Sequence, residues 1–261
     1  MSATATGSAP PDAAPRVPYV LRLADASLVH AQRLGEGNGH APALEEDLGL
    51  ANTALDLMGQ GRLLLAYAGE LEGQGRDEDA LAFLREEHEF LNPTLVEQPN
   101  GDFAHTIVRQ FLFDAWQLGL YEALCGSKDA TLAAVAAKGR GEAAYHLRYS
   151  GGWLVRLGDG TPESHARVAG SLARLWPYTR ELFVDDDVER AVAEAGIGVL
   201  PSALGDAFTA RVGETLARAT LSQPADTPFP WYGKQGRHSE HLGYLLAEMQ
   251  SLHRAHPGAT W

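Results

Sequence analysis

Apolar residues recur three and four positions apart along most of this 261-residue chain, which is the spacing of one face of an α-helix. The pattern predicts two pairs of long helices, over residues 19–73 and 103–157, each pair interrupted by a break. No segment shows the strict alternation of a half-buried β-strand. The sequence therefore predicts an all-α protein. Shorter helices are expected near 77–91, 162–183, 188–195, 203–221 and 239–254.

Helix ends are marked by residues that favour turns and caps. The glycines from Gly35 onward end the first helix, and Gly73 ends the second. Asp102 follows a Pro-Asn-Gly turn and is placed to cap the third long helix. Within the second helix we expect a leucine-rich face to enter the core. Its candidate core residues are Leu48, Leu55, Leu63 and Leu71.

The two helix pairs carry a similar arrangement of polar residues. In a ferritin-like four-helix bundle, two helices each supply one Glu to a di-iron site, and the other two each supply a Glu-x-x-His motif. Here the corresponding positions are Asp25 with Asp56 and Gly59, then Asp114 with Ala143 and His146. The spacing is 31 residues in the first pair and 29 in the second. This points to a ferritin-like helical bundle, although two amphipathic hairpins could share such a spacing by coincidence.

The ligand set at these positions is degenerate. Gly59 stands where a histidine is needed and Ala143 where a glutamate is needed, and the three remaining carboxylates are all Asp. Each Glu-to-Asp change withdraws the oxygens by about 1.5 Å, the length of one carbon–carbon bond. One imidazole, that of His146, does not replace the missing donors. We therefore expect this chain to bind no metal or cofactor at these six vestigial positions and to have no catalytic residue.

Buried carboxylates without metal need other partners. We predict a structural polar network of Asp25, Asp56, Asp114, Glu142 and His146 that sets the helix register. Glu142 and His146 are four residues apart and share a helix face. The expected cationic partners are Arg62, Arg109 and Arg148.

Composition limits the possible partners. Thirty-four acidic and 21 basic residues give a net charge of −13, which argues against nucleic-acid binding. No run of about 20 apolar residues predicts a membrane span. The single cysteine, Cys125, excludes an internal disulfide and fits a cytoplasmic protein. Residues 1–18 are rich in Ala, Pro, Ser and Thr and are expected to be a disordered tail before one helical domain at 19–261.

One further histidine pair is a candidate metal site. His238 and His241 are three residues apart at the expected start of the last helix. No third ligand is evident, so a solvent-exposed helix start is the simpler interpretation.

Several unusual strings resemble a known family. They include Arg33-Leu34-Gly35-Glu36, Gly39-His40-Ala41-Pro42, Val96-Glu97-Gln98-Pro99-Asn100-Gly101, Leu55-Asp56-Leu57-Met58-Gly59-Gln60, Tyr145-His146-Leu147-Arg148, Glu240-His241-Leu242-Gly243 and Leu246-Ala247-Glu248-Met249-Gln250. Over about residues 19–261 the chain resembles the C subunit of the bacterial phenylacetyl-CoA epoxidase, also called ring 1,2-phenylacetyl-CoA monooxygenase.

The resemblance implies a ferritin-like, non-catalytic structural subunit of a multicomponent monooxygenase in phenylacetate catabolism. It implies that a separate catalytic subunit holds the di-iron centre and binds the CoA thioester, and that a reductase supplies electrons from NADPH. That catalytic subunit is the expected partner, in a hetero-oligomer. Candidate aromatic residues for the shared face are Trp153, Trp176, Tyr178, Trp231 and Tyr232.

Two alternatives remain open from the sequence. The first is a self-sufficient carboxylate-bridged di-iron oxygenase or an iron-handling ferritin relative, with Glu142 replacing Ala143 through a change of helical register. The second is a free-standing helical binding protein without any link to an oxygenase.

Overall fold

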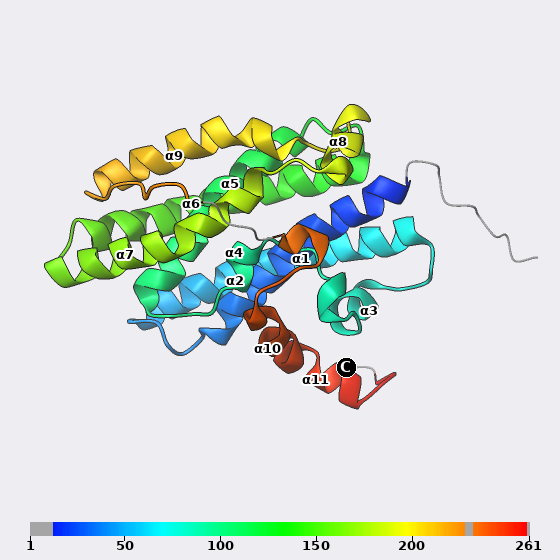
Figure 1. The fold of residues 1–261 in the computed structure, drawn as a ribbon. Coiled ribbons are helices and arrows are strands. Elements are labelled where there is room, and N and C mark those ends of the chain that lie inside the picture. The colour runs from blue at the N-terminus through cyan, green and yellow to red at the C-terminus, as the bar shows by residue number, and fades with distance from the viewer. Residues whose placement is uncertain (1–12, 228–231, 260–261) are drawn as a thin grey trace, which may run out of the picture.

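The computed structural model describes residues 13–227 and 232–259, and these are helical apart from turns, loops and one isolated bridge between Tyr232 and Arg237. Four long helices dominate the molecule (Figure 1). Helix α1 lies along α2 and α5 lies along α6, and α2 also contacts α6. The prediction of an all-α protein is confirmed for the described residues. The four long helices are α1 (Ala13–Glu36), α2 (Leu44–Glu72), α5 (Phe103–Leu124) and α6 (Ala130–Gly158).

Shorter elements cover the outside of these four helices. Helices α7 and α9 pack on α5 and α6, and α8 packs on α1 (Figure 1). Helix α10 contacts α1, and α3 contacts α2. These elements are α3 (Glu78–Phe83), α4 (Thr94–Glu97), α7 (Pro162–Leu175), α8 (Asp187–Glu194), α9 (Gly205–Arg218), α10 (Glu240–Met249) and α11 (Ser251–Ala255), with 3-10 turns η1 (Glu87–Glu89), η2 (Trp176–Phe183), η3 (Pro201–Leu204) and η4 (Gly233–Gln235).

Local sequence explains where the helices begin and end. Asp102 accepts a hydrogen bond from the His105 backbone N–H at 2.9 Å, so the predicted cap of α5 is confirmed. Asp129 caps α6 in the same way. Gly73 ends α2 in the left-handed conformation at φ 66°, which glycine adopts without steric cost. These capping and turn residues therefore act at the ends where they were predicted.

Close packing of α1 against α2 depends on a glycine. A Cβ on Gly61 would lie 3.3 Å from the Leu28 backbone nitrogen and 3.4 Å from the Ala24 carbonyl oxygen. Both contacts are with backbone atoms, which do not move aside as a flexible side chain would. The two helices can therefore approach closely at this level of the bundle.

Two expectations about the bounds of the elements differ from the structure. Residues 13–18, predicted as part of the tail, belong to α1, which continues through Pro18 although this residue has no backbone N–H to donate. Residues 1–12 lie outside the described residues. The segment 77–91 forms only the short helix α3 and the turn η1, because it folds back to place Arg85 against α1.

The predicted core face of α2 is wrong. Leu48, Leu55 and Leu63 are 55%, 65% and 45% exposed, and Leu71 is half-buried. Leucines occur all around this helix, so periodicity alone does not select its buried side. The side that packs on α1 and the core carries Leu50, Ala54, Leu57, Leu64, Leu65 and Ala68.

The aromatic residues expected at a partner face are mostly engaged within the chain. Trp176 is buried and donates its indole N–H to Asp226 at 3.1 Å. Trp153 packs edge-on against Phe103, and Arg237 lies over the Tyr232 ring. Tyr178 is half-buried, and Trp231 lies outside the described residues. The exposed aromatic residue near α2 is instead Tyr145, at 52%.

Candidate functional site

The centre of the bundle is polar, and all four long helices contribute to it. Most of these side chains are fully buried, whereas Asp56 and Glu142 lie at the rim with side chains 42% and 22% exposed. The set consists of Ser27 and His30 from α1, Asp56 and Gln60 from α2, Gln110, Asp114, Gln117 and Tyr121 from α5, and Glu142, His146 and Ser150 from α6.

Asp114 sits in this centre without a cation among its hydrogen-bond partners. The Gln110 side-chain amide and the Ser150 hydroxyl donate to its two carboxyl oxygens, each at 2.7 Å. Burial raises the pKa of Asp114 well above its usual range, and the two hydrogen bonds oppose that shift only in part. The carboxyl group therefore favours the protonated, neutral form.

Asp56 and His146 form the contact between α2 and α6. The His146 Nε2 lies 3.0 Å from the Asp56 carboxylate. Burial lowers the pKa of His146, and the nearby carboxylates of Asp56 and Glu142 oppose the shift. The structure thus brings together two of the five residues of the predicted network at this contact.

A second group of hydrogen bonds surrounds Gln60. Its carbonyl oxygen accepts from the Tyr121 hydroxyl at 2.9 Å and from the Gln117 amide at 3.1 Å. Its own amide donates to Glu142 at 2.8 Å. Glu142 is therefore held by Gln60, and by Lys138 at 3.8 Å, and not by His146 as its spacing suggested.

Asp25 does not join the centre. Its carboxylate pairs with Arg85 and also accepts the Leu91 backbone N–H at 2.8 Å. Asp25 and Arg85 are both buried, and the Arg85 guanidinium lies 4.1 Å from the Phe90 ring centroid. This face of α1 points toward the α3–η1 segment. The interpretation of one network containing Asp25, Asp56 and Asp114 is therefore corrected to separate groups.

The two vestigial positions that lack a donor atom, Gly59 and Ala143, differ in where they face. Ala143 is fully buried beside His146. Gly59 faces open space, because a Cβ there would meet no atom within 4 Å. The inward-facing residue at this turn of α2 is Gln60, one position later.

The three arginines expected to pair with the central carboxylates lie elsewhere. Arg62 is exposed and pairs with Glu78 at 3.1 Å. Arg109 is buried and donates to the Gln98 carbonyl at 2.6 Å. Arg148 lies over the Tyr145 ring. Helix periodicity indicates the face on which an arginine lies. It does not indicate which partner the long side chain reaches from that face.

His30 is the central residue that the sequence reasoning missed. It is fully buried and its ring lies 4.5 Å from that of Phe113. Among the described residues neither ring nitrogen makes a hydrogen bond of good geometry, although the Gln110 side chain lies close enough to interact with the ring. Burial, Arg109 and His146 lower its pKa well below the usual range, although the Gln110 amide opposes them. For the central residues of α5 that the sequence reasoning also missed, a signal was present: Gln110, Gln117 and Tyr121 stand four before, three after and seven after Asp114, so they mark the inward face of α5.

The histidine pair near α10 is not a solvated helix start. The His238 side chain is fully buried, with one ring nitrogen 2.8 Å from Glu97 and the other 2.8 Å from the Phe90 carbonyl. Glu97 raises the pKa of His238 against the effect of burial. Glu97 also accepts the Ser239 backbone N–H at 2.6 Å. Both nitrogens of His238 are therefore committed to protein acceptors.

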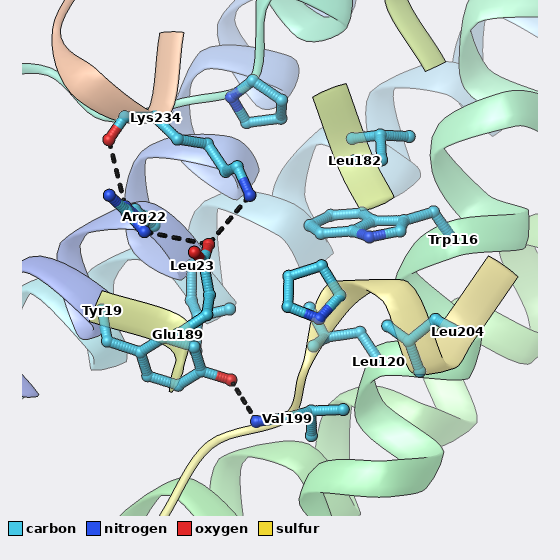
Figure 2. A pocket seen from close by; sticks show the side chains of 12 residues that line it. Tyr19, Arg22, Leu23, Trp116, Leu120, Leu182, Glu189, Val199, Leu204 and Lys234 are labelled. Atoms are coloured by element: carbon cyan, nitrogen blue, oxygen red, sulfur yellow. Dashed lines mark hydrogen bonds and ion pairs between the residues drawn. The ribbon is translucent and has the colours of Figure 1, made fainter. Parts of the chain in front are cut away.

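An apolar cavity lies nearer the beginning of α1, between Tyr19, Leu23, Trp116, Leu120 and Leu204 (Figure 2). It encloses about 30 Å³. This is the space of about one water molecule, far below the roughly 150 Å³ of a cavity that binds benzene.

Charged groups form one wall of this cavity. Arg22 pairs with Glu189 at 2.9 Å, and Lys234 reaches Glu189 at 2.8 Å (Figure 2). Arg22 also pairs with Asp186. These bonds tie α1 to α8 and to the segment around η4. The cavity is therefore a small gap beside a structural ion cluster.

Comparison with known proteins adds the family. A family model described as "Phenylacetic acid catabolic protein" matches residues 2–261. A relative from Escherichia coli (strain K12), named as the C subunit of 1,2-phenylacetyl-CoA epoxidase, is 52% identical over 243 residues, which cover 93% of this chain and 98% of the relative. The chain belongs to the phenylacetic acid catabolic protein family. The resemblance found in the sequence strings is confirmed.

The strings that carried this resemblance to the phenylacetic acid catabolic family meet in space. Arg33 donates to the Glu97 carbonyl at 2.8 and 3.0 Å and to the His241 carbonyl at 2.9 Å. Asn100 donates to the Arg33 carbonyl at 2.6 Å. The end of α1, the turn after α4 and the start of α10 are thereby joined. These residues hold the fold together around one buried guanidinium.

Two kinds of feature were searched for among the described residues and not found. Among residues 13–227 and 232–259, no three His, Cys, Asp or Glu side chains are grouped as a metal-binding set. No helix in the same ranges is both long enough and apolar enough to cross a membrane.

Proposed function

We propose that this chain is the non-catalytic structural subunit of a multicomponent phenylacetyl-CoA epoxidase in aerobic phenylacetate catabolism, with a ferritin-like fold. The similarity to the C subunit of that epoxidase over nearly the whole chain supports the assignment to the complex. The observation that carries the structural role is the hydrogen bonding of the vestigial positions. Asp25 forms an ion pair with Arg85, and Asp56 contacts the His146 ring. Asp114 accepts hydrogen bonds from Gln110 and Ser150.

This donor set does not fit a pair of iron ions. Gly59 and Ala143 offer no donor atom, Asp25 faces away from the other carboxylates, and both carboxyl oxygens of Asp114 already accept hydrogen bonds, from Gln110 and Ser150. A paired-iron site needs four carboxylates and two imidazoles converging from four helices. In the proposed complex, a separate cytoplasmic catalytic subunit holds the iron and binds the CoA thioester, and a reductase supplies electrons from NADPH.

Iron binding by this chain itself is the second candidate, and His30 is the observation in its favour. Its two ring nitrogens are buried and, among the described residues, make no hydrogen bond of good geometry, with only the Gln110 side chain close enough to interact. A buried imidazole of this kind is an available ligand. Metal analysis therefore has to accompany the activity test.

The test uses the full chain purified alone, the catalytic subunit and the reductase. After incubation with ferrous iron and removal of the excess, we expect iron well below one equivalent in this chain and near two in the catalytic subunit. With phenylacetyl-CoA and NADPH, this chain plus reductase should form no epoxide, and the three proteins together should. Near-stoichiometric iron and turnover without the catalytic subunit would refute the proposal.

A further inference from the structure

An open cleft lies beside the turn that follows α4, between the beginning of α5, the end of α7 and the beginning of α10. Its volume is about 540 Å³, within the range of roughly 300–1,000 Å³ that is usual for small-molecule sites. The turn at 98–101 and His241 belong to two of the strings that carried the family resemblance. The polar side chains on which the argument rests are Asn100, Asp102, His105, Arg174, Tyr178 and His241.

Arg174 supplies the cation of this cleft. It is exposed on α7, and among the described residues its guanidinium donates only to the Ser171 hydroxyl, at 3.2 Å, and pairs with no carboxylate. By contrast Arg167, two turns earlier on the same helix face, pairs with Asp102 at 3.3 Å and with Glu163 at 2.5 Å. An arginine has five N–H donors, so most of those of Arg174 are open to a ligand.

Two imidazole rings line the same cleft, His105 from α5 and His241 from α10. Neither ring makes a hydrogen bond to another described residue. Gly101 leaves room for the first ring, because a Cβ at that position would lie 3.1 Å from the His105 Cβ and 3.2 Å from its Cγ. A neutral imidazole keeps one N–H donor in either tautomer. The two rings therefore add donors to those of Arg174.

Two buried guanidinium groups hold the walls of the cleft in place. Arg109 donates to the Gln98 carbonyl at 2.6 Å, and Arg33 donates to the His241 carbonyl at 2.9 Å. Neither arginine pairs with a buried carboxylate among the described residues, since the acidic partner of Arg33 is Glu36, with a side chain 41% exposed. Their charges make this region more positive than a net charge of −13 suggests. Because the walls are fixed, a ligand loses little conformational entropy in ordering them.

The ionisation of His105 reflects these surroundings. Burial is the largest cause that lowers its pKa to about 4, and the charges of Arg109 and Arg174 act in the same direction, whereas Asp102 opposes them. Asp102 is the one carboxylate in the lining among the described residues, and both of its oxygens are occupied. One accepts the His105 backbone N–H at 2.9 Å, and the other lies 3.3 Å from Arg167. The cleft therefore offers donors and positive charge, with little acceptor capacity of its own.

A dianion rich in acceptor oxygens fits this arrangement. A phosphate group carries close to two negative charges at neutral pH and has three strong acceptor oxygens. These can accept from a guanidinium fork and from two imidazoles at once. The cleft is larger than a phosphate group alone requires, and part of its wall is apolar. That part consists of Pro99, Leu175 and the ring of Tyr178, against which an organic body attached to the phosphate can pack.

We propose that this cleft binds a phosphate dianion through Arg174, His105 and His241. Free inorganic phosphate and the phosphate monoester of a small organic molecule are two sources of this group, and the apolar wall favours the second. The site is formed by this chain alone, so the inference does not rest on the proposed function.

The test is a titration of the full chain with inorganic phosphate at about pH 7.5, where phosphate carries close to two charges. Histidine ring signals are followed by NMR at constant ionic strength. The His105 and His241 signals should shift together and saturably, and the pKa of His105 should rise from about 4, because a bound anion favours the imidazolium form. Arg174→Ala should weaken binding about tenfold or more, through the loss of a charged hydrogen bond. Arg174→Lys keeps the charge but loses the planar fork, and should weaken binding less.

Matched controls are Arg218→Ala and His88→Gln, which change an exposed arginine and an exposed histidine outside the cleft. Both should bind phosphate like the unmodified chain. Coenzyme A and dephospho-coenzyme A, which lacks the phosphate monoester, distinguish the two sources. Coenzyme A that binds more tightly than both inorganic phosphate and dephospho-coenzyme A would support an organic phosphate as the ligand. Binding of inorganic phosphate that coenzyme A does not exceed would support free phosphate.

Three results would overturn the proposal. They are the absence of a saturable shift with both inorganic phosphate and coenzyme A, an equal shift with chloride at the same ionic strength, and unchanged binding in Arg174→Ala. Melting temperatures check that each variant remains folded, and the exposed position of Arg174 makes its replacement the safest of them. None of these results bears on the proposed function, which is tested separately by iron content and epoxide formation.

Discussion

Asp25 and Asp114 occupy equivalent positions in the two helix pairs, yet the chain satisfies them in opposite ways. Asp25 is matched by the buried guanidinium of Arg85. Asp114 receives only the neutral donors of Gln110 and Ser150, and its pKa is raised. A buried carboxyl group can be stabilised by an opposite charge or by giving up its own charge. Glu97, held by His238, is an intermediate case with a titratable partner.

Removing the cation that pairs with Asp25 should cause the largest loss of stability. Arg85→Met should lower the free energy of unfolding by about 3–5 kcal/mol, because it leaves a carboxylate buried without its cation. Denaturant unfolding measures the change. The control Arg62→Met removes an exposed ion pair with Glu78 and should cost less than about 1 kcal/mol. Equal losses in the two variants would contradict the distinction, and Asp25→Leu/Arg85→Met should recover part of the stability.

The Glu97–His238 pair should show a pH-dependent loss. His238→Gln should lower the free energy of unfolding by about 3 kcal/mol at pH 6, because a buried charged hydrogen bond is lost. The folded-state pKa of His238 is raised above 6.5, so its contribution is complete below about pH 6.5 and is lost as pH rises through the folded value. Unfolding curves at several pH values test this. The exposed His40 provides the control variant His40→Gln, and a pH-independent cost would contradict the prediction.

Removing the Asp114 side chain should lower the free energy of unfolding by less than the two changes above. The effect should also depend on pH, as expected for a carboxyl group whose pKa is raised in the folded state. Asp114→Ala should cost about 2 kcal/mol, because buried donors lose their acceptor. The folded state keeps a proton that the unfolded chain releases above about pH 3.8, so unfolding free energy falls as pH rises from there toward the folded pKa. Asp114→Asn should therefore gain stability relative to the unmodified chain between pH 4 and 7. A constant difference across that range would show that Asp114 is ionised.

The smallest expected effect is a gain. His30→Leu removes two buried nitrogens that lack partners among the described residues, and should raise the free energy of unfolding by about 1 kcal/mol. Thermal or denaturant unfolding at pH 7 measures it, with His146→Leu as the matched change at a histidine that does have a partner. The latter should destabilise. A loss of stability in His30→Leu would indicate that a bound water or ion satisfies the ring.

Helix α2 shows what hydrophobic periodicity can and cannot predict. It gives the extent of the helix but not its buried side. The sequence predicts its length and its end at Gly73 closely, but places Leu48, Leu55 and Leu63 on the wrong side. A helix with leucines on every side contains two apolar faces, and only the contacts with α1 and α6 decide which one is buried.

The candidate site is predictable in part. Asp56 and His146 are selected by their spacing and do contact each other, and Asp114 is recognisable as a carboxyl group in apolar surroundings. His30 escapes prediction because a lone histidine in a helix has no spacing pattern of its own. Arg85 escapes it because this side chain reaches Asp25 from a segment predicted to be regular helix.

The sequence by itself determined the helical class, the main helix boundaries and the family, because periodicity, caps and unusual strings are encoded locally. Only the tertiary structure decided which partner each buried carboxyl group takes and which face of α2 remains open. Many of those contacts join side chains far apart in the chain, such as Asp25 with Arg85, 60 residues away, and Asp56 with His146, 90 residues away. The free energy of each such contact depends on how deeply its groups are buried and how far apart they lie. Both are set only when the helices pack together.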